Sequence, residues 1–273
     1  MQIKYLTMPS ISLIVATYNW PEALNVCLLS IKQQALLPDE VIVADDGSDD
    51  ATKALINEMQ QDFPIPLIHV WQPDLGFRKT LILNKAIAKA SSAYIVQVDG
   101  DVILDKHFVN DHASVAEQGF FIRGTRAHIS RTYVDKVLRE KKVNFNYSSA
   151  GIIHRFNAFR LPALAFLMEK KSNKSSGVRG SNLAFWKSDF MVVNGYDNDL
   201  TGWGHEDEEL AIRFINNNIL RKSVKFKCVQ FHLYHSECSH DRKPLHVVAV
   251  SNTRKQNLRS SQNGIGNLNT AES

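Results

Sequence analysis

The stretch "EVIVADDGSDD", residues 40–50, decides the fold class, because an apolar run stops at carboxylates and a helical segment follows it. A short apolar run bounded by polar turn residues is typical of a buried strand in a parallel sheet. "ISLIVATYN" (11–19) repeats the plan before a helix that Pro21 opens, and "AYIVQVDGD" (93–101) adds another such strand. Strands that alternate with helices predict βαβ units around a parallel sheet.

The other patterned segments extend this plan along the chain. A strand is predicted at 65–71 and a helix at 79–90, and the second half is expected to hold strands at 180–186 and 228–235. After Ser251 the chain is polar with few bulky apolar side chains, which predicts a disordered tail.

Length and composition favour one large domain that buries a sizeable core, since the chain has 273 residues and is 44% hydrophobic. Its 32 basic and 28 acidic residues give a net charge of +4 without a long block of one sign, so no nucleic-acid partner is expected. Cys27, Cys228 and Cys238 form no C-x-x-C pair, which favours free thiols and the cytoplasm. Without an apolar run of roughly 20 residues or a signal peptide, any membrane association is expected to be peripheral.

Polar clusters fall at three predicted strand ends, where open α/β sheets bind their ligands. These clusters are Thr17/Tyr18/Asn19, Asp45/Asp46/Gly47/Ser48 and Asp99/Asp101. The carboxylates of "VADDGS" are suited to accept hydrogen bonds from a nucleobase or a ribose, although Ser48 or Asp49 can also cap the next helix. We therefore expect three separate stretches to meet at one edge of the sheet.

"VDGD" (98–101) places Asp99 and Asp101 around a glycine, so that both carboxylates can turn toward one hard divalent cation. The alternative is an ordinary acidic loop at a strand end, which short motifs of this kind often are. His232 and His235 lie at the end of the last strand. Three apart on an extended segment, they are expected to point to opposite faces, so at most one should face the site, either as a structural histidine or as a further cation ligand.

"GWGHEDEEL" (202–210) sets Trp203 between glycines and four acids in a first helical turn. Acids at that position complement the helix dipole, and this account suits Glu208 and Glu209. Glu206 and Asp207 lie nearest the exposed start and are expected to face a cleft, where a carboxylate could act as a general base.

In order and spacing, these motifs resemble family 2 glycosyltransferases with the GT-A fold, over roughly residues 10–240. "EVIVADDGSDDAT" is close to that family's E-[IV]-I-V-V-D-D-G-S-x-D-x-T signature, "VDGD" occupies its D-x-D position, and "GFRKTLILNKAI" resembles the segment under the nucleotide. "RGSNLAFWKSDFMVVNGYDNDLTGWGHEDEELAIRF" resembles the C-terminal module of chondroitin-polymerase-type and β-1,4-galactosyltransferase-type enzymes. The implied fold is a Rossmann-like, mostly parallel central sheet flanked by helices.

The resemblance also implies a division of the chain. After an N-terminal extension at 1–9, residues 10–127 would form the half that binds the nucleotide sugar, and 179–250 the half that binds the acceptor and carries catalysis. A variable helical and basic insert would occupy 128–178, and the disordered tail 251–273.

The implied activity is that of a hexosyltransferase-type enzyme that inverts the anomeric centre. It would use Mn²⁺ or Mg²⁺ and move a sugar from a nucleotide donor, usually a UDP-sugar, to a hydroxyl of a glycan or lipid-linked glycan acceptor. A bacterial surface polysaccharide or lipopolysaccharide is the expected product.

The site residues that the resemblance implies fall into four groups. Asp207 would be the catalytic base, with Glu206 beside it, and Trp203 and Asn182 would contact the acceptor. The metal would be bound by Asp101 and His235, with Asp99 on the ribose or metal side. The donor nucleotide would be held by Thr17, Tyr18, Asn19, Asp46, Gly76, Arg78, Asn84 and Asp99. Where the polymerase-like relatives have Arg-Asn, this chain has Leu83-Asn84, so Arg78 or Lys79 is expected to supply a phosphate contact.

Three other functions agree less well with the sequence than glycosyl transfer. A sugar-nucleotide pyrophosphorylase uses a glycine-rich loop after its first strand, whereas residues 16–20, "ATYNW", contain no glycine. A catalytically silent binding module would be expected to lack the D-x-D or E-D acids, and both are present. A nicotinamide dehydrogenase is disfavoured because no G-x-G-x-x-G follows a strand.

Residues 152–171, "IIHRFNAFRLPALAFLMEKK", mix bulky apolar and basic side chains. They predict either a surface element that rests on anionic lipid at the inner face of the plasma membrane or a lid packed over the acceptor cleft.

Overall fold

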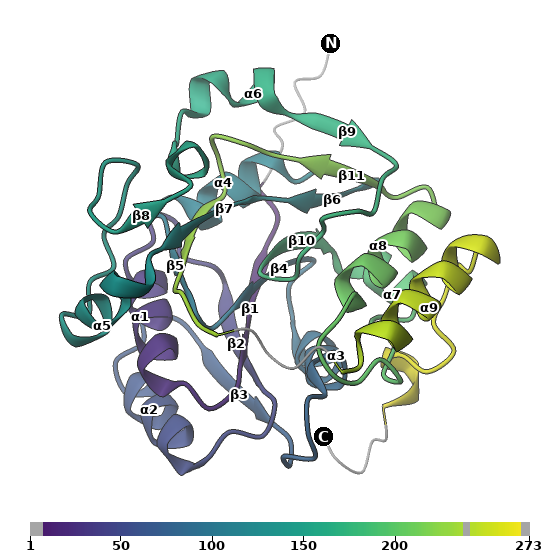
Figure 1. The fold of residues 1–273 in the computed structure, drawn as a ribbon, viewed down its shortest axis with the longest axis horizontal. Helices are drawn as coiled ribbons and strands as arrows, with labels where there is room; N and C mark the ends of the chain where they lie inside the picture. The colour runs from purple at the N-terminus through teal and green to yellow at the C-terminus, as the bar shows by residue number, and fades with distance from the viewer. Residues whose placement is uncertain (1–7, 237–240, 269–273) are drawn as a thin grey trace.

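Two β-sheets organise the protein, and the computed structural model describes residues 8–236 and 241–268 of it (Figure 1). Within these residues the larger sheet has eight strands in the order β3-β2-β1-β4-β10-β6-β11-β9, and the smaller has four in the order β5-β12-β7-β8. Most of the predicted N-terminal extension, and Cys238, lie outside the described residues.

The first half alternates strands and helices, as predicted. Its elements are β1 (Ile11–Thr17), α1 (Pro21–Lys32), β2 (Glu40–Asp45), α2 (Asp50–Gln60), β3 (Leu67–Trp71), α3 (Lys79–Lys89), β4 (Tyr94–Asp99), β5 (Val102–Leu104), α4 (Phe108–Val115) and β6 (Phe120–Arg123). Strands β3, β2, β1 and β4 run parallel to one another. Their carboxyl ends therefore share one edge of the sheet.

The second half completes both sheets. It comprises β7 (Thr125–Ile129), α5 (Arg131–Arg139), β8 (Ile152–Ile153), the 3-10 helices η1 (Arg155–Ala158) and η2 (Pro162–Leu164), α6 (Ala165–Met168), β9 (Lys170–Ser172), β10 (Asn182–Trp186), α7 (Lys187–Val192), α8 (Glu206–Asn216), β11 (Leu220–Ser223), β12 (Val229–His232), α9 (Lys243–Lys255) and η3 (Ile265–Asn267). Strand β10 runs antiparallel to β4, so the sheet is mixed where the two halves meet.

The segment at 128–178 is more closely built into the fold than an insert would be. Its β8 pairs with β7 in the smaller sheet, and its β9 pairs with β11 at the edge of the larger one. These two strands connect the segment to both sheets, so helices make up only part of the helical and basic insert predicted at 128–178.

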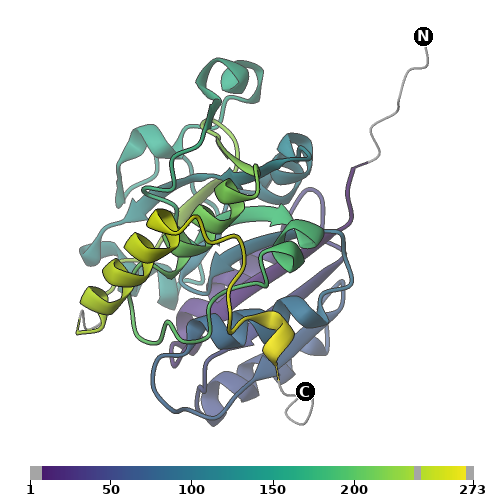
Figure 2. The ribbon, with the colours of Figure 1, turned by 90° about the vertical axis from the view of Figure 1, so that its right-hand side faces the viewer.

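Helices cover both faces of the larger sheet, and successive residues of β1 show how. Leu13 and Val15 pack with α1, α2 and α4, whereas Ile14 and Ala16 pack with α3, α7 and α8. A strand buried on both faces reads as a continuous apolar run, which explains the sequence pattern. Figure 2 shows α9 lying across the outside of this second layer.

A buried ion pair ties α8 to the loop that follows α7. Arg213 bonds Glu209 of the same helix at 2.6 Å, and its guanidinium also donates to the carbonyls of Val193 and Gly195. Thr253 of α9 donates to Glu209 at 3.0 Å. Because the charges are buried, paired and hydrogen-bonded, they anchor helix α8 to the loop after α7 and to α9.

The prediction of a disordered tail is wrong for residues 251–268. Helix α9 continues to Lys255, and the chain then turns back so that Ile265 is buried in the core beside α3. Asn194 holds this segment, because its side chain donates to the carbonyl of Ser261 and its carbonyl accepts from Ile265. Tertiary hydrogen bonds thus order a segment whose composition alone indicates disorder.

Candidate active site

The predicted convergence of strand ends is confirmed. The amide of Gly100, after β4, donates to the carbonyl of Ala16 at 2.7 Å, and the amide of Asp46, after β2, donates to that of Thr17 at 3.1 Å. Asn19 adds to this connection through its amide, which donates to Ser48 Oγ at 2.9 Å. The three polar clusters therefore form one continuous edge.

The side of this edge where the sequence predicts a nucleotide donor is closed by the loop at 72–78. Asp46 accepts hydrogen bonds from the amide of Arg78 at 2.8 Å and from Gln72 at 2.6 Å. Burial raises the pKa of Asp46, although these hydrogen bonds oppose the rise. The loop is thereby fixed against β2, with Gly76 exposed at its outer end.

Tyr18 closes the loop from the other side. Its hydroxyl donates to Asp74 at 2.9 Å, and its ring is half exposed. The amide of Gly76 also donates to Asp74. A Cβ at Gly47 would lie 2.6 Å from the Asp74 backbone, so only glycine permits this approach of the two loops.

Asn84 does not face the nucleotide edge, contrary to the assignment by resemblance. It is fully buried, and its side chain donates to the carbonyl of Tyr196 and to Asn198 while it accepts from the Tyr196 amide. Its hydrogen-bonding groups are therefore used inside the fold. Asn84 thereby fixes the turn at 194–199.

Asp101, His232 and His235 lie together and could hold a metal ion. One ligand atom from each falls within 4.8 Å of the others, with Asp101 Oδ2 3.3 Å from His232 Nε2 and 3.1 Å from His235 Nε2. Burial would raise the pKa of Asp101, but the hydrogen bond from His235 and the histidine charges lower it. Asp101 Oδ1 is buried without a hydrogen-bond partner among the described residues.

The expectation that at most one histidine faces the site is wrong. Strand β12 ends at His232, and the amide of Leu233 donates to the carbonyl of Asp101 at 2.9 Å. The extended geometry that sends alternate side chains to opposite faces therefore stops between the two histidines. Both imidazoles reach the same carboxylate.

Asp99 points away from this cluster toward Lys79, at the start of α3. Asp99 Oδ1 lies 2.6 Å from Lys79 Nζ. Burial would lower the pKa of Lys79, but the charges of Asp99, Asp207 and Glu206 hold it above its ordinary value. Lys79 therefore remains a cation between the acids of β4 and the acids of α8.

Asp207 lies in the first turn of α8, and its carboxylate is held from two sides. Oδ2 accepts from the amide of Gly180 at 2.6 Å, and Oδ1 lies 3.0 Å from the hydroxyl of Tyr196. Burial and the adjacent Glu206 raise the pKa of Asp207 to about 7. A carboxylate with that pKa can accept a proton near neutral pH.

Glu206 is buried beside this base, as expected of a residue at the start of the helix that faces inward. Burial raises its pKa, and Lys79 partly offsets the rise. Its Oε2 lies 3.9 Å from His246 Nδ1, beyond hydrogen-bond distance. The remaining acids of this turn pair with arginines, Glu209 with Arg213 and Glu208 with Arg254.

Trp203 is partly exposed near the start of α8, where a sugar could stack on its ring. Lys243 of α9 lies 5.8 Å from the ring centre. The flanking Gly202 and Gly204 leave no room for a Cβ, since Arg242 and His246 lie 2.5 Å and 2.3 Å from those positions. Helix α9 therefore fixes the loop that carries the tryptophan.

Asn182 does not reach the acceptor side, contrary to its assignment. It is buried, donates to the carbonyls of Thr125 and Cys228 at 2.8 Å, and lies 3.1 Å from His112 Nε2. Burial lowers the pKa of His112 to about 4, so the neutral ring donates to Asn182. Asn182 joins the two sheets.

Sequence analysis did not identify Tyr196, Gln97 and Gly180 as part of the site. Tyr196 is buried with its hydroxyl between Gln97 and Asp207, and burial raises its pKa so that it stays protonated. The available signal was the glycine in "RGSN", which permits a close backbone approach but does not specify a partner.

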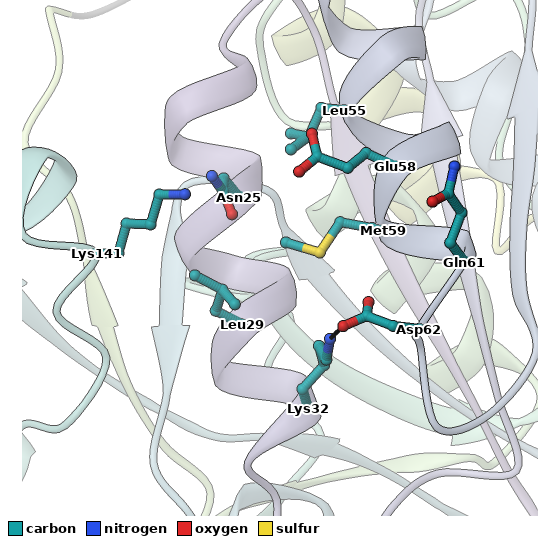
Figure 3. A pocket seen from close by; sticks show the side chains of 9 residues that line it. All are labelled: Asn25, Leu29, Lys32, Leu55, Glu58, Met59, Gln61, Asp62 and Lys141. Atoms are coloured by element: carbon teal, nitrogen blue, oxygen red, sulfur yellow. Dashed lines mark hydrogen bonds and ion pairs between the residues drawn. The ribbon is translucent and has the colours of Figure 1, made fainter.

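Two hollows in the surface were compared with this site. The groove between α1 and α2 in Figure 3 is lined by Leu29, Met59 and the Lys32–Asp62 ion pair, and none of the site residues lines it. A second, open hollow is lined by Asn19 and His235 among others. It joins the nucleotide edge to the candidate metal ligands.

Residues 12–174 match the family described as "Glycosyl transferase family 2", which is more than half of the chain. Residues 164–236 match the family described as "N-terminal domain of galactosyltransferase". The second match covers Asp207 and both histidines. In the described part of the chain, every helix is too short or too polar to cross a membrane.

Curated relatives with named activities are similar over most of this chain. Validoxylamine A glucosyltransferase of Streptomyces hygroscopicus subsp. limoneus is 28% identical over 76% of this chain and 48% of its own length. Chondroitin synthase of Escherichia coli is 25% identical over 81% of this chain and 34% of its own length. The chain thus spans about half, or less, of these relatives.

Among solved structures, GalNAc-T7 with UDP, GalNAc and Mn²⁺ has a TM-score of 0.68 at 13% identity. The likeness covers 91% of this chain and 48% of that one. At this identity it establishes the fold alone, which is the GT-A arrangement expected from the sequence.

Proposed function

Because the chain belongs to glycosyl transferase family 2, we propose that it moves a sugar from a nucleotide donor, a UDP-sugar, to an acceptor hydroxyl with inversion. One observation carries this proposal: Lys79 lies 2.6 Å from Asp99, at the end of β4, and the charge of Asp207, whose pKa is raised to about 7, also acts on Lys79. The candidate base and the D-x-D acids thus share one cation, as expected where a proton acceptor and a metal seat serve a single displacement.

Asp207 acts as the general base in this proposal. The acceptor oxygen bonds to the anomeric carbon as the bond from that carbon to the diphosphate oxygen breaks, and the acceptor proton passes to Asp207. The Gly180 amide and the Tyr196 hydroxyl hold the carboxylate in position. The incoming oxygen displaces the diphosphate from the opposite side, so the step inverts the anomeric centre without an enzyme nucleophile.

The residues Asp101, His232 and His235 fit a divalent ion. Asp101 Oδ1 and His232 Nδ1 are buried without hydrogen-bond partners among the described residues, and three ligand atoms already face one another. A carboxylate with two imidazoles suits Mn²⁺ better than Mg²⁺, which is usually bound through carboxylates, phosphates and water. Such an ion would stabilise the charge that grows on the leaving diphosphate.

The nucleotide is proposed to lie along the edge formed by Thr17, Tyr18, Asn19 and Asp46, with the loop at 72–78 beside it. The half-exposed ring of Tyr18 offers a stacking surface, and Gly76 and Arg78 belong to the loop that Asp46 fixes. Lys79, rather than a residue at position 83, supplies the positive charge near the diphosphate.

The acceptor is proposed to be a glycan or lipid-linked glycan of a bacterial surface polysaccharide or lipopolysaccharide, with Trp203 as its stacking platform. Synthesis would take place in the cytoplasm at the inner face of the plasma membrane. The activity named for the chondroitin synthase supports a glycan acceptor.

Peripheral contact with anionic lipid is proposed for the apolar knob, defined here as residues 161–168. Figures 1 and 2 show this segment, with α6, at the top of the molecule. Phe166 is 70% exposed and Leu167 64% exposed. Exposed Lys170 and Lys174 follow the knob, so apolar insertion and attraction to anionic headgroups act together. This exposure favours a lipid surface over a packed lid.

The proposed function is tested by screening UDP-sugars for metal-dependent UDP release with glycan acceptors. Asp101→Ala and Asp207→Asn should each abolish release while the protein stays folded. Unchanged turnover in both variants would refute the mechanism, and donor binding without any turnover in the wild type would indicate a silent binding module.

A further inference from the structure

Four arginines gather beside the candidate base, and none was singled out by its sequence motif. This arginine cluster consists of Arg123 at the end of β6, Arg126 in β7, Arg221 in β11, and Arg179 just before β10. Strand β6 pairs with both β10 and β11, which brings three of these segments together.

The hydrogen bonds that the cluster makes go to neutral groups. Arg123 donates to the carbonyl of Gly177 and Arg221 to that of Ser176, each at 2.7 Å, and Arg126 lies 3.4 Å from Ser181 Oγ. Burial lowers the pKa of Arg123, and the charges of Arg221 and Arg179 lower it further. The charges that act most strongly on Arg123 are thus of its own sign.

Burial and like charges also act on Arg126. Burial and the charge of Arg179 lower its pKa, while the carboxylates of Asp99 and Asp101 partly offset the fall. Arg126 therefore lies at the border between the donor acids and the other arginines. Partly desolvated like charges oppose folding, and such arrangements are concentrated at functional sites.

The cluster adjoins the base through one peptide bond. Arg179 is exposed and precedes Gly180, whose amide donates to Asp207 Oδ2. The acids that act on Arg126 are those of the donor side, whereas the groups that act on Arg123 are arginines alone. The cluster thus extends from the base away from the donor acids.

We propose that the arginine cluster binds an acidic group, a carboxylate or a phosphate, on the acceptor glycan. The proposal rests on the function proposed above and narrows its acceptor to an anionic one. Guanidinium groups bind carboxylates and phosphates through paired, charge-assisted hydrogen bonds, and four of them around the loop at 175–181 concentrate positive charge beside the base. An acidic sugar bound there would present its hydroxyl to Asp207.

The test compares Arg179→Gln and Arg179→Lys with Arg139→Gln, a matched loss of charge at an exposed position on α5. Acceptors would be a uronic-acid oligosaccharide, its methyl ester, and an oligomer of a polyol phosphate. We expect Arg179→Gln to raise KM for the acidic acceptors about 10- to 100-fold, in the range set by loss of charge-assisted hydrogen bonds. In Arg179→Gln, the KM for the methyl ester, the kcat and the acceptor-free hydrolysis of the donor should change little. Arg139→Gln should behave as wild type with every acceptor.

Three results would overturn the proposal. Equal losses with the acid and its ester would mean that Arg179 only supports the loop at 175–181. A parallel loss of acceptor-free donor hydrolysis would assign the arginines to the donor diphosphate. Equal KM values of the wild type for the acid and its ester would show that the protein does not recognise the negative charge of the acceptor. Comparison of the uronic-acid oligosaccharide with the polyol-phosphate oligomer shows whether the cluster binds a carboxylate or a phosphate.

A failure of the proposed function would be recognised separately. If wild type released no UDP with any donor, calorimetry of oligogalacturonate against the intact protein would still report on the cluster. Binding that weakens in Arg179→Gln but not in Arg139→Gln would support the subsite. Absence of binding to wild type, or equal weakening in both variants, would refute it.

Discussion

The amide of Gly180 donates to Oδ2 of Asp207 at 2.6 Å, although the two residues lie 27 positions apart in the chain. This contact joins the start of β10 to the first turn of α8. It orients the candidate base and lies at the border of the arginine cluster, so several predictions depend on it.

Substitution Gly180→Ala should impair the base without unfolding the protein. The new Cβ would lie 2.4 Å from Gln97 Nε2 and 2.6 Å from Asp207 Oδ1, so the carboxylate must move. A displacement of about 1 Å at a reacting group costs on the order of 100-fold in rate. UDP release measures the loss, and circular dichroism with thermal melting checks the fold. Wild-type turnover in the folded variant would contradict the positioning role.

The pH profile should report on Asp207. The base acts when deprotonated, so kcat/KM should rise with pH through about 7 and level off above it. Glu206→Gln removes the neighbouring charge that raises this pKa, so the rising limb should move to lower pH. Tyr196→Phe removes a hydrogen-bond donor to the carboxylate and should move it to higher pH. Identical profiles in all three proteins would argue against Asp207 as the titrating base.

Mn²⁺ affinity should depend on both histidines at the candidate metal seat. Calorimetry should show that Asp101→Ala, His232→Ala and His235→Ala each weaken binding by at least about 10-fold, the loss expected even for outer-shell groups. His128 is the matched control, because its ring lies 5.4 Å from that of His232 yet it belongs to no ligand group. An equal loss of Mn²⁺ affinity in His128→Ala would mean that the substitutions weaken binding by disturbing the fold rather than by removing a ligand. Chelation by EDTA should abolish turnover, and added Mn²⁺ should restore it.

The Arg213–Glu209 pair should be needed for stability. Arg213→Met leaves a buried carboxylate without its main partner, at a cost of about 3–5 kcal/mol in the free energy of unfolding. The double variant Arg213→Met/Glu209→Met should be less destabilised than either charge-breaking single variant. Urea denaturation measures the three values, and a cost near zero for Arg213→Met would contradict the role of the pair.

Replacement of apolar side chains on the knob should weaken lipid contact without affecting catalysis on a soluble acceptor. Phe166→Ser/Leu167→Ser should lower co-sedimentation with phosphatidylglycerol vesicles, while turnover in solution stays as in wild type. Val247→Ser/Val248→Ser is the control, since these exposed residues lie on α9 rather than on the knob. Equal sedimentation of all three proteins would refute the membrane proposal.

Strands β1, β2 and β4 could be predicted from sequence because each is buried on both faces. Continuous apolar runs such as "VIVA" then specify a strand, and the polar residues behind them mark its carboxyl end. The same reasoning brought Thr17, Asp46 and Asp99 to one edge. Glu206 and Asp207 were expected to face a cleft, which stays a prediction; the structure places the two acids beside one another, and burial raises the pKa of both.

The errors concern residues whose partners are distant in the chain. Asn84 and Asn182 carry groups that suit a ligand, yet tertiary contacts with Tyr196, Thr125 and Cys228 use those groups. Both histidines reach Asp101 because β12 ends between them, a boundary that spacing alone does not reveal.

The sequence by itself determined the parallel core, the edge where its strands end and the acids placed there, because these follow from local patterns of period and polarity. Only the tertiary structure decided which polar groups remain for a ligand, since that depends on hydrogen bonds between segments far apart. It also gathered the arginine cluster, whose members come from three strands and a loop and have no common motif. Burial among like charges is a property of the folded chain, and no short stretch of sequence encodes it.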